Sequence, residues 1–133
     1  MTRAELRKHI DAIEGSYEFF LAYAAQGATG EAAERANGQV RDFLTKMDGA
    51  LSKIAQGFRE LIAQEPVSPA EPYHAMIDLL ERDAKNAQTG VQFVSAQAAI
   101  TSQLVDNLNS STHVRAMLTD MFLVDEVLGV GES

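Results

Sequence analysis

The sequence predicts an all-α protein, and three observations support this prediction. Apolar residues recur at alternating spacings of three and four through most of the chain, as they do along the buried face of a helix. No stretch alternates apolar and polar residues for long enough to predict a strand. The 3 prolines fall together between positions 66 and 72, so proline interrupts this pattern in one place only.

The first two helices are expected over about residues 3–26 and 30–64. Thr2 can cap the first, because a Thr followed three residues later by Glu, here Glu5, forms a capping box. The glycines of segment 27–30 mark the break between the two helices. The second helix carries a 3.5-residue apolar repeat with Asn37 as a polar interruption, a narrow seam of the coiled-coil kind, formed by Ala33, Val40, Leu44, Met47, Leu51, Ile54, Phe58 and Leu61.

Two further helices are expected over about residues 70–109 and 112–128. The linker that contains the prolines precedes the first of them and divides the chain into halves. The run Asn109-Ser110-Ser111-Thr112 separates the two helices, because these side chains favour caps over helix interiors. Residues 129–133 are expected to form a flexible tail.

Two long helices joined by a proline-containing turn predict an antiparallel hairpin. The first helix would cover part of the seam, and the short last helix would fold back on the hairpin or pack on another subunit. The expected architecture is therefore a long antiparallel helical hairpin within a single-domain bundle of three or four helices, over residues 1–128. Part of the seam is left for a partner chain to cover.

Composition limits the possible functions. The chain has 133 residues, 46% of them hydrophobic, and a net charge of -8, which argues against binding to nucleic acid or to an anionic membrane. The absence of cysteine excludes disulfides, thiolate zinc sites and cysteine nucleophiles. No apolar run reaches the roughly 18 residues of a membrane span, so a cytoplasmic location is expected.

The segment between Asn86 and Val114 contains a single charged residue, Asp106. Charged residues are depleted at the centres of protein interfaces, although a helix buried at the centre of one chain would show the same depletion. Methionines on the last helix provide an adaptable apolar face of the kind used in binding. We expect a contact with a second copy of the chain, or with a larger complex, through Val94, Gln97, Ala98, Thr101, Ser102, Val105, Met117, Met121 and Phe122.

An aromatic cluster in the first helix is a candidate ligand pocket. Tyr17, Phe20 and Tyr23 could enclose a flat cofactor, with the tyrosine hydroxyls as polar handles. The same residues could equally form the thick end of the hydrophobic core, and core packing is the favoured interpretation.

Carboxylates and histidine suggest a candidate metal site. Glu71 and His74 have the Glu-x-x-His spacing that di-metal carboxylate bundles use, but no second such pair occurs in the sequence. Glu71 is better explained as a helix-capping carboxylate. Glu14 and Glu18 could bind a divalent cation from the first helix, whereas such rows more often form a solvated face.

No catalytic constellation is present, and no cofactor is expected. The sequence therefore predicts a non-enzymatic helical interaction protein, an accessory, assembly or scaffold component that acts through helix faces as a homo-oligomer. The alternative is a helical bundle that binds a small molecule or a metal, through the aromatic pocket or a ferritin-like di-metal site.

Overall fold

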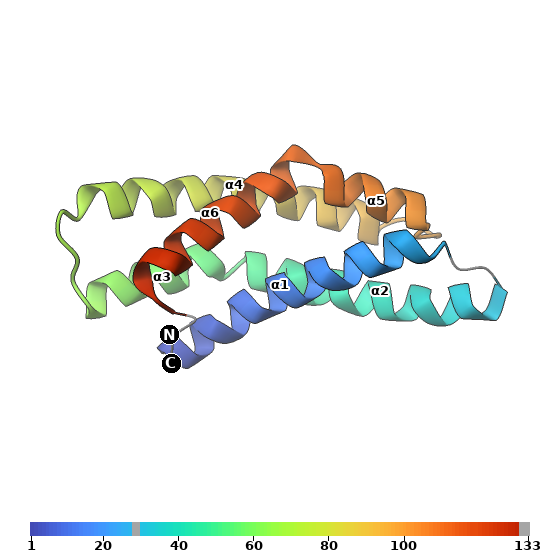
Figure 1. The fold of residues 1–133 in the computed structure, drawn as a ribbon, viewed down its shortest axis with the longest axis horizontal. Helices are drawn as coiled ribbons and strands as arrows, with labels where there is room; N and C mark the ends of the chain where they lie inside the picture. Colours follow the sequence, from blue (N-terminus) through green and yellow to red (C-terminus); the bar gives the residue numbers. More distant parts are fainter. Residues whose placement is uncertain (28–29, 131–133) are drawn as a thin grey trace.

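The computed structural model describes residues 1–27 and 30–130, and for residues 30–34 it describes the backbone only. Within these ranges all regular structure is helical and no strand occurs, so the all-α prediction is confirmed. The helices shown in Figure 1 are α1 (Arg3–Gln26), α2 (Gly30–Leu51), α3 (Ile54–Gln64), α4 (Glu71–Ser95), α5 (Ser102–Ser110) and α6 (Thr112–Leu128).

The ends of α1 follow from local chemistry. The Thr2 hydroxyl accepts a hydrogen bond from the Glu5 backbone N–H at 3.1 Å, which satisfies one of the free donors of the first turn. Gly27 ends the helix with a φ of 57°, a left-handed conformation that glycine adopts without steric cost. Both ends coincide with the expected range.

The expected helix over residues 30–64 is interrupted, because Ser52 and Lys53 separate α2 from α3. The Ser52 hydroxyl donates to the Asp48 carbonyl at 3.3 Å, and the Lys53 N–H bonds three residues back to Ala50 at 3.0 Å. Gln88 of α4 also donates to the Asp48 carbonyl at 3.0 Å. Seam residues on both sides of the break are buried, so the apolar repeat does not indicate the break. The side chain of Ala33 lies outside the described residues.

The expected helix over residues 70–109 is also interrupted, because residues 96–101 form a loop between α4 and α5. The Thr101 side chain caps α5 by accepting from the Leu104 N–H at 3.0 Å. The rest of the loop is held by side chains of the first two helices. Arg41 donates to the carbonyls of Ser95 (3.1 Å), Gln97 (2.7 Å) and Ala98 (3.0 Å).

The helices pack on one another around one hydrophobic core. Helix α4 contacts α2, α3 and α6, and helix α1 contacts α2, α3 and α5. The two ends of the described chain lie at the same end of the elongated molecule (Figure 1). None of the helices in the described ranges combines the length and apolarity that a membrane span requires.

The first two residues of the flexible tail expected over residues 129–133 are ordered. Gly129 caps α6 with a φ of 65°, and the Val130 side chain is buried. Residues 129 and 130 therefore belong to the packed fold, because the αL cap turns the chain back onto it. Residues 131–133 lie outside the described residues.

Candidate functional site

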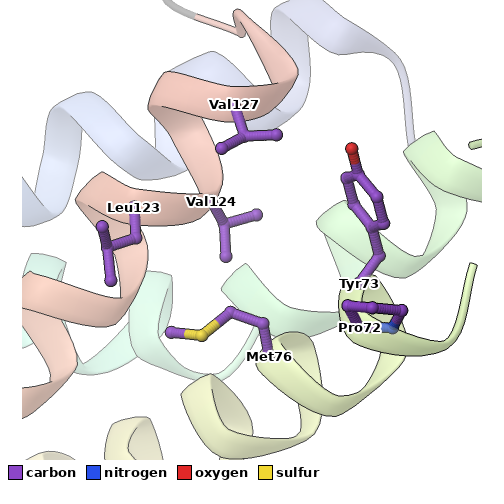
Figure 2. A pocket seen from close by; sticks show the side chains of 6 residues that line it. All are labelled: Pro72, Tyr73, Met76, Leu123, Val124 and Val127. Carbon is purple, nitrogen blue, oxygen red and sulfur yellow. The ribbon is translucent and has the colours of Figure 1, made fainter. Parts of the chain in front are cut away.

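An apolar groove lies between the beginning of α4 and the end of α6 (Figure 2). Its volume is about 390 Å³. Only one of the lining side chains, that of Tyr73, carries a hydrogen-bonding group, and the others are aliphatic or contain a thioether. The lining residues are Pro72, Tyr73, Met76, Leu123, Val124 and Val127.

Helical spacing brings these side chains together. Pro72 and Met76 are four residues apart on α4, and so are Leu123 and Val127 on α6, which places each pair on one helix face. Val124 turns into the core and is buried, whereas Leu123 is 54% exposed and Val127 is 65% exposed. The groove is therefore open to solvent along α6.

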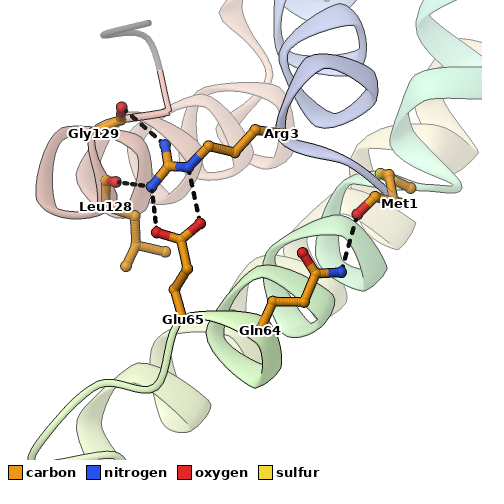
Figure 3. Close-up of polar contacts among 6 residues, drawn as sticks. All are labelled: Met1, Arg3, Gln64, Glu65, Leu128 and Gly129. Atoms are coloured by element: carbon orange, nitrogen blue, oxygen red, sulfur yellow. Dashed lines mark hydrogen bonds and ion pairs between the residues drawn. The ribbon is translucent and has the colours of Figure 1, made fainter.

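Arg3 fixes the end of α6 against α1 and α3 (Figure 3). Its guanidinium donates to both carboxylate oxygens of Glu65, at 3.0 and 3.1 Å, and this contact holds the pKa of Glu65 below its usual value. The same guanidinium donates to the carbonyls of Leu128 at 3.3 Å and Gly129 at 3.2 Å. Such a cation at a helix C-terminus is favourable, because the final carbonyls lack partners within the helix.

Arg59 fixes the beginning of α4 against α3. It pairs with Asp78 at 2.8 Å and with Glu81 at 2.7 Å, and its hydrogen bond to Glu81, helped by its charge, lowers the pKa of that carboxyl. Upstream, Ala70 accepts backbone hydrogen bonds from Tyr73 and His74, both at 3.1 Å. Both walls of the groove are therefore anchored to α3.

A carboxyl pair joins the same two helices beside the groove. Asp120 of α6 is only 6% exposed, and its Oδ2 atom has no hydrogen-bond partner. Burial, together with the hydrogen bond and the negative charge of Asp83 on α4, raises the pKa of Asp120 to about 7. The α4–α6 contact therefore includes a carboxyl group that holds its proton to near-neutral pH.

The expected interface residues divide into two groups. The structure places Val94, Val105, Met117 and Met121 in the chain's own core, so these four are not surface residues of a single chain, and this part of the prediction is corrected. Their apolar stripe is covered by other helices of the same chain, which was the alternative reading. The remaining residues lie at the surface or are half-buried: Gln97, Ala98, Thr101, Ser102 and Phe122.

The aromatic cluster of α1 is used in packing. Phe20 and Tyr23 are buried, Tyr17 packs partly buried against the core, and the Tyr23 hydroxyl donates to the Ile100 carbonyl. Nearby, Phe19 stacks on Phe43 of α2 with 4.3 Å between ring centroids. These contacts explain the cluster as the thick end of the core.

The candidate metal ligands lie on two different helices. Glu14 and Glu18 are on α1, the first half-buried and the second exposed, and Glu71 and His74 are both exposed at the beginning of α4. Burial is the main cause that raises the pKa of Glu14. In the part of the chain that the structure describes, no group of three or more potential ligands is placed to hold a metal ion.

Sequence reasoning missed the groove, although a signal was available. Leu123 and Val127 are apolar but fall outside the stripe that α6 turns to the core, and an amphipathic helix usually carries polar residues at such positions. Apart from the Tyr73 hydroxyl, the groove lining offers only apolar groups for contact. No family model, curated protein or solved structure matches this chain.

Proposed function

We propose that this chain is a non-enzymatic helical interaction protein that binds a partner through the groove between α4 and α6. The main observation behind this proposal is that Leu123 and Val127, which line an apolar groove, are exposed to solvent. Single exposed apolar residues are ordinary on protein surfaces, whereas a contiguous apolar patch with a hollow is typical of a binding site. An accessory, assembly or scaffold role fits such a surface.

The proposal includes the arrangement of the helices. We propose that α2 and α3 together form one arm of an antiparallel hairpin and α4 the other, within a helical bundle. The contacts of α4 with both α2 and α3, and the burial of the seam residues from Val40 to Leu61, support this arrangement. In such a bundle α6 closes over α4, and the groove remains where the two helices separate near their ends.

The occupant is either a second copy of the chain or a different protein in a larger complex. Either would bury Leu123 and Val127, and each such side chain gains roughly 1.5–3 kcal/mol when fully buried. The position of the contact is therefore the first point to test, before the identity of the partner.

Site-specific photo-crosslinking in cells of the native source tests the position. A photoreactive phenylalanine analogue would replace Leu123 or Val127 in the full chain. The matched control carries the same group at Phe93, which is 66% exposed near the far end of α4. We expect a product of higher mass from positions 123 and 127 and none from position 93. Equal yields at all three positions, or no product, would refute the proposal.

A further inference from the structure

We infer that the groove accepts an amphipathic helix of a different protein, with apolar side chains that enter the groove and basic side chains beside them. This inference rests on the proposed function and specifies its partner. It follows from the shape of the groove, the chemistry of its lining and the charge of the two helices that form it.

The shape favours a helix. Peptides are commonly recognised by addition to a sheet edge, by a groove lined with several aromatic residues, or by a groove that holds a helix. The described residues contain no strand and hence no sheet edge. Tyr73 is the one aromatic side chain among the lining residues. Two helices that bound an apolar groove accept the ridge of side chains of a third helix.

The lining favours a protein over a small molecule. Small-molecule sites bury most of the ligand surface and orient the ligand with a few convergent polar groups. The Tyr73 hydroxyl is the only polar group among the lining side chains of this groove. Leu123 and Val127 are exposed, so the groove is open along one side. A row of apolar side chains on a longer partner needs neither enclosure nor polar anchors.

The charge favours a basic partner. Helix α4 carries four acidic and two basic side chains, and α6 carries three and one. Several of these carboxylates are not available to a partner, because Arg59 pairs with Asp78 and Glu81, Arg7 pairs with Asp125 at 3.6 Å, and Asp120 is buried. Two exposed carboxylates stand directly beside lining residues in the sequence, Glu71 before Pro72 and Glu126 before Val127. Lysine or arginine on the partner would complement them and speed association.

The same charges disfavour a second copy at this site. A symmetric contact brings the same surface of both chains together, so each chain would present the exposed Glu71 and Glu126 to the same residues of the other. The net charge of -8 adds to this repulsion. A different, basic protein removes the conflict.

Fluorescence anisotropy with three labelled synthetic peptides tests the inference. The first is an 18-residue helix, about five turns, with leucines spaced three and four apart and lysines elsewhere. The second replaces every lysine by glutamate, and the third scrambles the first so that its composition is kept and its apolar face is lost. We expect the first peptide to bind at least about tenfold more tightly than either control, and more weakly as salt is added.

Matched variants locate the binding. Leu123→Ser with Val127→Ser should weaken the lysine peptide about tenfold, whereas Phe93→Ser should change its affinity less than about twofold. Circular dichroism verifies that each variant keeps its helix content. Equal binding of the lysine and glutamate peptides, or of the scrambled peptide, overturns the inference, as does a Phe93→Ser effect equal to that of the double variant.

Sedimentation of the chain alone completes the test. A dimer that Leu123→Ser with Val127→Ser dissociates would replace the basic partner by a second copy. A monomer at all concentrations supports a different protein as the occupant. If position 127 forms crosslinks in cells but the chain does not prefer the lysine peptide in the binding experiment, the proposed function is supported and only this inference is refuted.

Discussion

Two glycines of neighbouring helices show how much the environment of one residue decides. A Cβ atom added at Gly49 of α2 would meet no atom within 4 Å. A Cβ atom added at Gly57 of α3 would stand 2.6 Å from Leu6 Cδ1 and 2.8 Å from Met1 Sδ. Leu6 is buried against the core, so its side chain has little room to move. Gly57 is therefore the place where α1 and α3 approach closely.

Alanine at these two positions should have opposite effects. Gly49→Ala should raise the free energy of unfolding by up to about 1 kcal/mol, because alanine favours the helix over glycine by that amount. Gly57→Ala gains the same helix propensity but overpacks the contact with Leu6, at a cost of about 1–3 kcal/mol. Urea denaturation of both variants measures the difference. A Gly57→Ala protein as stable as Gly49→Ala would show that α1 and α3 separate freely.

At the scale of elements, the sequence predicted helix type and outer ends well and helix continuity poorly. Thr2 and the glycine at position 27 are local signals, and they mark the ends of α1 as expected. The breaks at residues 52–53 and 96–101 depend on contacts between distant segments, such as those from Gln88 and Arg41. An apolar repeat continues through such a break, because the side chains on both sides still face one core.

The candidate site shows the same division. The aromatic and carboxylate candidates rest on residue type alone, and the structure places Phe20 and Tyr23 in the core. The groove depends on the distance between the beginning of α4 and the end of α6. No local sequence pattern determines this distance. Only the off-stripe positions of Leu123 and Val127 could have pointed to it.

Arg41 should be the main support of the loop between α4 and α5. Arg41→Met keeps much of the side-chain volume but removes the donors to the carbonyl of Ser95, at the end of α4, and to two loop carbonyls. We expect a loss of about 1–3 kcal/mol in the free energy of unfolding, with faster amide hydrogen exchange in residues 96–101. Arg82→Met, at an exposed position of α4, is the control and should change neither quantity. Unchanged exchange in the Arg41 variant would assign the loop's order to other contacts.

At the scale of the whole molecule, α6 is joined to the rest of the fold by one attractive electrostatic contact and one contact between two carboxyl groups. At the C-terminal end of α6, Arg3 donates hydrogen bonds to the last carbonyls and to the Glu65 carboxylate. Nearer its middle, Asp120 faces Asp83 of α4, a pair in which full ionisation is unfavourable. The contact of Arg3 with Glu65 and the last carbonyls holds α6 throughout the neutral pH range. The Asp120–Asp83 contact weakens when Asp120 loses its proton. This pair should therefore make a contribution to stability that falls as the pH rises.

The sign of that dependence follows from the two states of Asp120. In the unfolded chain its carboxyl titrates near pH 4, whereas in the folded chain its pKa is about 7. Between these values the folded state binds a proton that the unfolded state has lost, so the contribution of Asp120 to the free energy of unfolding falls as the pH rises from about 4 to about 7. Above pH 7 both states are deprotonated, and this contribution stays at its lowest value.

Asp120→Asn should remove this dependence, because the amide cannot ionise and can donate to Asp83. The variant should be more stable than the parent by about 1 kcal/mol or more at pH 8, and the difference should shrink toward pH 4. Urea denaturation across this range measures it, with Asp106→Asn at an exposed position of α5 as the control. Taking the difference between variant and parent cancels the opposite slopes of Glu65 and Glu81, whose pKa values are lowered by Arg3 and Arg59. Parallel profiles for Asp120→Asn and the parent would mean that α6 yields enough to hydrate the charged pair, and the groove that it bounds would then be mobile above neutral pH.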